Sequence, residues 1–127
     1  PHVVMVGGGV GITPIRALMD EFKNGVQMDV FYRVSKEEEL ILKDELDYLV
    51  ENSNGMTRVH YMVGSRKEFP MTADFLKSYA PRIADSDIYI CGPEALVETV
   101  RKAAEDLGVP KNRFHDEDFA FHPVHGG

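Results

Sequence analysis

The sequence of 127 residues contains a single cysteine, Cys91, and no Cys-x-x-Cys pair. One thiol cannot form an internal disulfide, so the chain suits a reducing compartment, and we expect a cytoplasmic location. The missing pairs also argue against a zinc site or a cysteine-ligated iron–sulfur cluster. The five histidines show no tight metal-ligand spacing, and His60 alternates within a strand pattern, where packing is expected. We therefore predict no metal site.

Basic residues and long apolar runs are also scarce. Lys and Arg total 14 against 21 Asp and Glu, which gives a formal net charge of -7. A domain that binds nucleic acid presents a basic face, so this balance argues against a nucleic-acid partner. No stretch is long and apolar enough to enter a membrane, and no signal peptide is visible. Because the chain opens directly on a strand pattern, we expect a piece of a longer protein.

Strand-like and helix-like segments alternate along the chain. This alternation predicts the α/β class: one Rossmann-like domain, a parallel five-stranded sheet with helices on both faces. In such a sheet the loops that follow the strands share one edge, where ligands bind. We assign the domain to residues 1–121 and expect a disordered tail over 122–127. The expected strands are His2–Val6, Met28–Val34, Thr57–Val63, Asp87–Cys91 and Arg113–His115, and the expected helices are Thr13–Lys23, Glu38–Glu51, Thr72–Tyr79 and Glu94–Leu107.

A glycine-rich loop follows the first expected strand. Glycine takes positive φ and lets the backbone approach a ligand, and a helix N-terminus offers unpaired N–H groups to phosphate. We predict Thr13 as the helix N-cap and Pro14 as its first residue. A turn without a ligand is the alternative, but the strand–loop–helix context favours a phosphate. The candidate binding residues in this loop are Gly8, Gly9, Val10, Gly11, Thr13 and Pro14.

The loop departs from the dinucleotide fingerprint G-x-G-x-x-G, because Ile12 stands where the third glycine is expected. Two further motifs follow: Ile88–Pro93, which reads Ile-Tyr-Ile-Cys-Gly-Pro, and Glu117-Asp118-Phe119 near the end. Together the three motifs resemble the nicotinamide-nucleotide domain of the ferredoxin–NADP reductase family, and the resemblance covers nearly the whole chain. The ending 114–121 is most similar to bacterial ferric-reductase-type members, whose flavin and nucleotide domains follow a membrane haem domain.

The resemblance implies a role for each residue near the nicotinamide. Cys91 would lie against the ring and orient its C4 toward a flavin, with Gly92 and Pro93 forming the adjacent turn. Glu117 would hold the carboxamide or tune the flavin edge, and Phe119 would pack beside the rings. Cys91, Glu117 and Phe119 are thus the catalytic candidates. Taken alone, these residues also fit a buried structural cysteine, a solvated acidic run and a core aromatic.

The other end of the nucleotide is expected near two basic loops. Arg33, close to the end of the second strand, is suited to bind pyrophosphate or ribose. No acidic residue ends that strand, where an NAD-selective site often has one. In NADP-selective members of the family, a Ser-Arg pair after the third strand contacts the 2′-phosphate, and Ser65 and Arg66 match it. We therefore expect NADP ahead of NAD, with an exposed basic turn as the alternative.

FAD is the second cofactor that the resemblance implies. The family holds it in a separate antiparallel barrel with an Arg-x-Tyr-Ser/Thr motif, which this sequence lacks. We expect an NAD(P)H-binding domain, inactive alone, that passes hydride to FAD in a flavin-binding domain of the same parent chain. Electrons would continue to haem, ferric iron or an iron–sulfur partner. The alternatives are a non-catalytic nucleotide-binding sensor or interaction module, and an α/β enzyme with a phosphate substrate.

Overall fold

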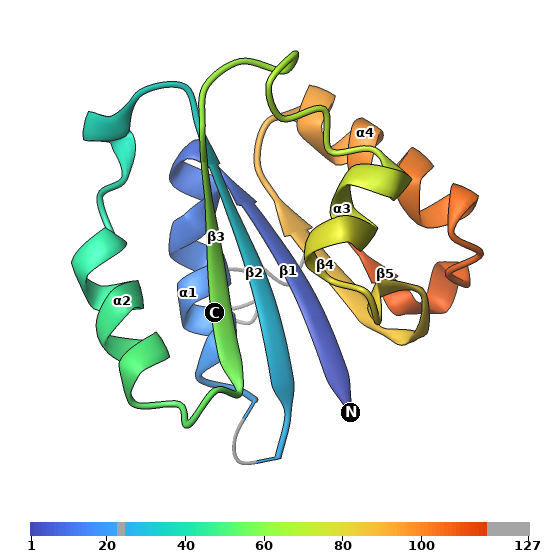
Figure 1. The fold of residues 1–127 in the computed structure, drawn as a ribbon. Coiled ribbons are helices and arrows are strands. Elements are labelled where there is room, and N and C mark those ends of the chain that lie inside the picture. The colour runs from blue at the N-terminus through green and yellow to red at the C-terminus, as the bar shows by residue number, and fades with distance from the viewer. Residues whose placement is uncertain (23–24, 117–127) are drawn as a thin grey trace, which may run out of the picture.

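The computed structural model describes residues 1–22 and 25–116 and shows an open, twisted sheet between two layers of helices (Figure 1). The strand order is β3-β2-β1-β4-β5, and all neighbouring strands are parallel. The predicted α/β fold with a five-stranded parallel sheet is therefore confirmed. The strands are β1 (His2–Gly8), β2 (Gln27–Val34), β3 (Thr57–Val63), β4 (Asp87–Cys91) and β5 (Phe114–His115).

The helices lie in pairs on the two faces of the sheet. Helices α1 (Ile12–Met19) and α2 (Lys43–Glu51) cover one face, and α3 (Ala73–Tyr79) and α4 (Glu94–Asp106) cover the other (Figure 1). Strand β1 is buried along its whole length because both faces of this central strand are covered. Its alternate side chains supply two cores, so that Val4 packs toward α3 and α4 while Met5 packs toward α1 and α2.

Three predicted helix starts differ from the structure. Helix α3 begins one residue late, at Ala73, because Thr72 is its N-cap. Helix α1 begins at Ile12 with Gly11 as N-cap, so Thr13 is not the cap and Pro14 is the third helical residue. The reason is a 3-10 turn over Gly9–Gly11 that runs directly into α1 and starts the helix inside the glycine loop. Helix α2 begins at Lys43 instead of Glu38, because the acidic run Glu37–Glu39 forms a separate 3-10 turn.

A buried carboxylate joins the three strands β1, β2 and β3 near their amino ends. Asp29 is 2% exposed and accepts hydrogen bonds from His2 Nε2 and His60 Nε2, both at 2.8 Å. Arg58 donates two more, at 2.9 and 3.1 Å. Burial alone would raise the pKa of Asp29, but the hydrogen bonds from His60, Arg58 and His2 outweigh it and hold this pKa well below its usual range. His60 is thus a packed structural residue, as expected.

The structure also bears on membrane and metal chemistry. Within 1–22 and 25–116, no helix is long and apolar enough to cross a bilayer. The same residues hold no cluster of three or more His, Cys, Asp or Glu side chains arranged for a metal ion.

Candidate functional site

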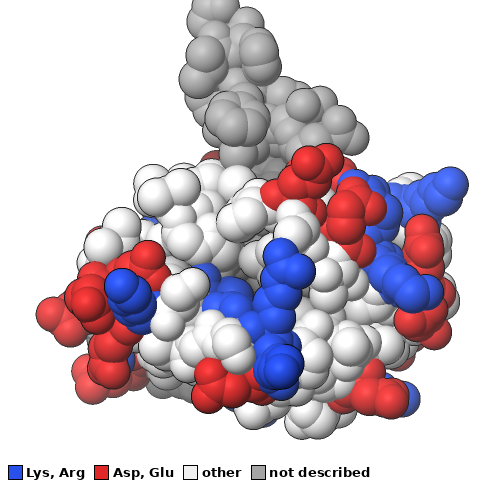
Figure 2. All heavy atoms as spheres, turned by 90° about the horizontal axis from the view of Figure 1, so that it is seen from above, with Lys and Arg blue, Asp and Glu red and all other residues white. Residues whose placement is uncertain are grey.

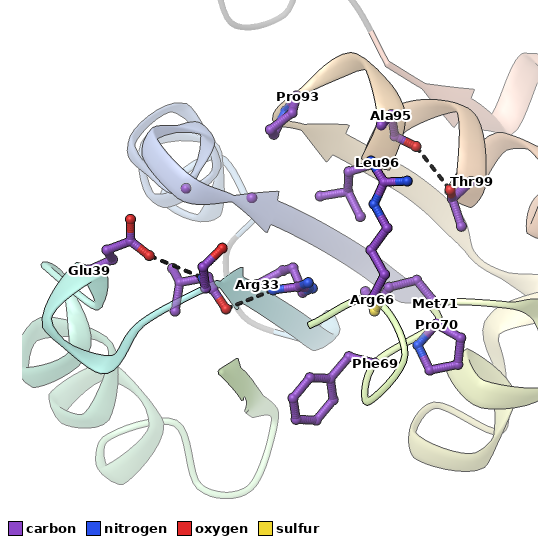
Figure 3. Close-up of a pocket in the computed structure, with 14 residues that line it drawn as sticks. Arg33, Glu39, Arg66, Phe69, Pro70, Met71, Pro93, Ala95, Leu96 and Thr99 are labelled. Atoms are coloured by element: carbon purple, nitrogen blue, oxygen red, sulfur yellow. Dashed lines mark hydrogen bonds between the residues drawn. The ribbon is translucent and has the colours of Figure 1, made fainter. Parts of the chain in front are cut away.

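A pocket of about 330 Å³ lies at the carboxyl-terminal edge of the sheet, between the glycine loop, the end of β2, the loop after β3 and the start of α4 (Figure 3). This is the edge at which open α/β sheets bind their ligands. Figure 2 looks onto this edge and shows Lys and Arg side chains near its centre with acidic side chains to either side. The lining residues are Gly8, Gly9, Arg33, Val34, Ser35, Glu39, Arg66, Phe69, Pro70, Met71, Pro93, Ala95, Leu96 and Thr99.

Two guanidinium groups dominate the electrostatics of the pocket. Arg33 is half-buried, and its Nη1 donates to the carbonyl of Val34 at 2.7 Å. Arg66 is exposed and makes no hydrogen bond or ion pair with any residue of the described part of the chain. The carboxylate of Glu39 is turned to its own loop, where Oε1 accepts from the N–H groups of Ser35 at 3.1 Å and Lys36 at 2.8 Å. The pocket therefore offers free positive charge to an anion.

The glycines of the loop after β1 and of the turn after β4 fall into two groups. Gly9 has φ +56°, and a Cβ built there would meet no protein atom within 4 Å. A Cβ on Gly11 would overlap the carbonyl of Cys91, and one on Gly8 would overlap the side chain of Leu96. Gly92 in turn packs closely on the backbone of Gly8. Gly9 thus leaves open space beside the pocket, whereas the other three glycines bring the loop after β1 against the turn after β4.

The structure brings only part of the predicted site together. Gly8, Gly9, Arg33, Arg66 and Pro93 line the pocket. Glu117 and Phe119 lie outside the described residues. The remaining predicted residues do not line the pocket: Val10, Gly11, Thr13, Pro14, Ser65, Cys91 and Gly92.

Cys91 is the last residue of β4 and lies beside Gly7 of β1. Its side chain is half-buried, and burial raises the pKa of the thiol. The thiol is therefore neutral at physiological pH, so it is suited to contact a ring and poorly suited to act as a thiolate nucleophile.

Sequence reasoning missed most of the apolar wall of the pocket. Phe69, Pro70 and Met71 follow Arg66 in one loop, and Leu96 comes from the first turn of α4. Their positions depend on the path of the loop, for which the sequence carries no periodic signal. Glu39 carries no such signal either, because the acidic run Glu37–Glu39 to which it belongs suits the first turn of a helix.

The sequence is similar to those of known oxidoreductases. Residues 5–102 match the family described as oxidoreductase NAD-binding domain. NADH-cytochrome b5 reductase 1 of Aspergillus oryzae is 31% identical over 94% of this chain and 48% of its own length. The protein of the same name from Pyricularia oryzae is 32% identical over 94% of this chain and 44% of its own length. The chain thus spans about half the length of these curated relatives.

Two solved structures share the fold. The cytochrome b5 reductase domain of Ulva prolifera nitrate reductase has a TM-score of 0.76 at 18% identity, over 91% of this chain and 49% of its own. The flavohem-like FAD/NAD-binding domain of nitric oxide dioxygenase from Vibrio cholerae O1 biovar El Tor has a TM-score of 0.70 at 28% identity, with the same two coverages of 91% and 49%.

Proposed function

Because the chain belongs to the family of oxidoreductase NAD-binding domains, we infer that it binds NAD(P)H and presents the nicotinamide for hydride transfer to FAD. In this proposal the FAD is held by a separate flavin-binding domain of the same parent chain. The names of the relatives support it: two are NADH-cytochrome b5 reductases, and a third protein is an FAD/NAD-binding domain. The proposal also agrees with a chain that matches only 48% of the first of these relatives.

The observation that carries the proposal is the pairing of free positive charge with open backbone in one pocket. Arg33 and Arg66 are suited to the phosphates of a dinucleotide, since a guanidinium binds phosphate oxygens in bidentate fashion. Gly9 leaves space where a side chain would otherwise stand. Phe69 and Leu96 add apolar walls that suit the planar base of a nucleotide.

The contribution of this chain to the reaction is binding and orientation. A bound NAD(P)H supplies the chemistry, a hydride with its two electrons, and this step needs no general base. The protein accelerates it by holding the donor carbon close to the acceptor in a fixed geometry. Cys91 at the end of β4 is proposed to contact the nicotinamide as a neutral thiol. The roles of Glu117 and Phe119 stay predictions.

Beyond the flavin, we propose that electrons pass singly to haem, ferric iron or an iron–sulfur partner. The words cytochrome b5 and flavohem in the relatives' names favour a haem acceptor. A membrane haem domain in the same parent chain is the narrower form of this proposal, and it rests on the resemblance of the ending 114–121 to ferric-reductase-type proteins.

Titration of the chain with NADH and with NADPH, followed by nucleotide fluorescence, tests the proposal. Arg33→Ala and Arg66→Ala should each weaken binding by roughly tenfold, because each removes a charge-assisted hydrogen bond to phosphate. Arg82→Ala is the matched control: Arg82 is exposed and bonds Gln27 at the opposite end of the sheet. The absence of saturable binding in the parent chain, or equal losses in all three variants, would contradict the proposal.

A further inference from the structure

The loop after β3 closes on itself through a carboxylate. Ser65 N–H donates to Oε1 of Glu68 at 2.9 Å, and the N–H of Glu68 donates to Oγ of Ser65 at 3.3 Å. Phe69 N–H completes the turn by donating to the carbonyl of Ser65 at 3.0 Å. The sequence Ser65-Arg66-Lys67-Glu68 therefore forms a reciprocal capping box in an isolated turn.

This turn uses the backbone N–H that Ser65 could offer an anion. The N–H donates to a carboxylate oxygen of Glu68, while the hydroxyl oxygen accepts from a backbone N–H and keeps its own O–H as a donor. The carboxylate of Glu68 also lies directly over Gly64, since a Cβ built on Gly64 would overlap Oε1 of Glu68. The position in which a phosphate oxygen could meet the N–H of Ser65 is thus already filled by a negatively charged oxygen.

Arg66 is placed differently from its neighbours in this loop. Arg66 lines the pocket, whereas neither Ser65 nor Glu68 does. Gly64 N–H donates to the carbonyl of Val34 at 3.0 Å and fixes the start of the loop to the end of β2. The loop thus brings a guanidinium into the pocket while it keeps the carboxylate of Glu68 two residues further along the same turn.

We propose that Glu68 is a specificity-determining residue that disfavours the 2′-phosphate of NADPH and so makes NADH the preferred coenzyme. This inference rests on the proposed function. A 2′-phosphate brings about two further negative charges, which a nearby carboxylate repels. The phosphate would also have to displace the Glu68 carboxylate to accept from the backbone N–H of Ser65. NADH carries no group that meets either obstacle.

Replacement of Glu68 by Gln tests the proposal, because the amide oxygen can still accept from Ser65 N–H while the charge is removed. In Glu68→Gln, affinity for NADPH should rise by roughly fivefold relative to the parent, and affinity for NADH should stay within about twofold. The gain should shrink at high salt, where charges are screened. Glu105→Gln is the matched control, since Glu105 is an exposed carboxylate near the end of α4 outside the pocket lining.

An equal NADPH-to-NADH ratio in the parent, Glu68→Gln and Glu105→Gln chains would overturn the inference while leaving coenzyme binding itself intact. Failure of the parent chain to bind either coenzyme would instead overturn the proposed function.

Discussion

Glycine has two separate roles in the loop between β1 and α1. Gly9 adopts a backbone conformation that L side chains rarely take, and its missing side chain leaves space open to solvent and ligand. Gly11 has ordinary helical φ, but the carbonyl of Cys91 occupies the place where its Cβ would stand. Gly9 therefore leaves open space at the pocket, whereas Gly11 allows the close contact between two loops.

This difference predicts that the same substitution affects mainly stability at Gly11 and mainly coenzyme binding at Gly9. Gly11→Ala should lower the free energy of unfolding by about 1–3 kcal/mol, because the new methyl group overpacks a tight backbone contact. Gly9→Ala should cost only about 1 kcal/mol of stability, from its positive φ, but should weaken NADH binding by roughly tenfold. Urea denaturation and coenzyme titration of both variants measure the two effects.

Gly108→Ala is the control for the strain at Gly9. Gly108 has φ +79° and open space around its Cβ position, and it lies beyond the end of α4, outside the pocket lining. The free energy of unfolding of Gly108→Ala should fall by as much as that of Gly9→Ala, with no loss of affinity for NADH. If Gly108→Ala and Gly9→Ala lose the same affinity, strain and not the pocket explains the effect.

At the scale of single residues, sequence motifs located the polar half of the pocket. Gly9, Arg33 and Arg66 were predictable because each lies at the carboxyl end of a strand or in the loop after it, and parallel strands bring these positions to one edge. Phe69 and Leu96 were not, because their contact with the pocket depends on how far one loop and one helix turn reach across the sheet. NADP was predicted from Ser65 and Arg66; that prediction and the inference drawn from Glu68 lead to opposite coenzyme ratios.

At the scale of elements, hydrophobic periodicity predicted all five strands, and β3 and β4 agree with the prediction at both ends. The covered sheet imposes continuous apolar runs on its central strands, and these are easily detected. Helix starts were less predictable because short-range turns compete for the same residues. The acidic run Glu37–Glu39 suits a first helical turn, yet its last carboxylate caps Ser35 and Lys36 and stabilises a separate turn.

The contact among β1, β2 and β3 through Asp29 predicts a pH-dependent stability. Asp29 has a folded pKa below its ordinary value of 3.8, so the stabilisation is complete above that value and is lost as the pH falls through the folded pKa. At pH 7, Asp29→Asn should lower the free energy of unfolding by about 3 kcal/mol, since it removes one partner of a buried charge cluster. Below pH 3.8 the difference in free energy of unfolding between the parent and Asp29→Asn should become smaller.

Urea denaturation across this pH range measures this difference directly. Asp85→Asn, a change at an exposed carboxyl in the 3-10 turn before β4, should leave stability unchanged within about 0.5 kcal/mol. A difference for Asp29→Asn that is constant with pH would show that the ionised carboxylate is not what joins the three strands.

At the scale of the whole molecule, the two edges of the sheet have different tasks. The amino-terminal edge carries the closed network around Asp29, in which each carboxylate oxygen accepts two hydrogen bonds. The carboxyl-terminal edge carries Arg66 without a partner among the described residues and a pocket of about 330 Å³. The charged groups of the Asp29 network pair within the protein, whereas the guanidinium of Arg66 at the other edge has no partner among the described residues.

Backbone amide mapping by NMR tests this division most directly. Stepwise addition of NADH to the ¹⁵N-labelled chain should shift the amide signals of Gly9, Arg33 and Arg66 in a saturable way, and those of Asp29 and Arg58 should stay fixed. This pattern would place the coenzyme in the pocket at the carboxyl-terminal edge. Saturable shifts confined to the amino-terminal edge, or no shifts at millimolar NADH, would contradict the account.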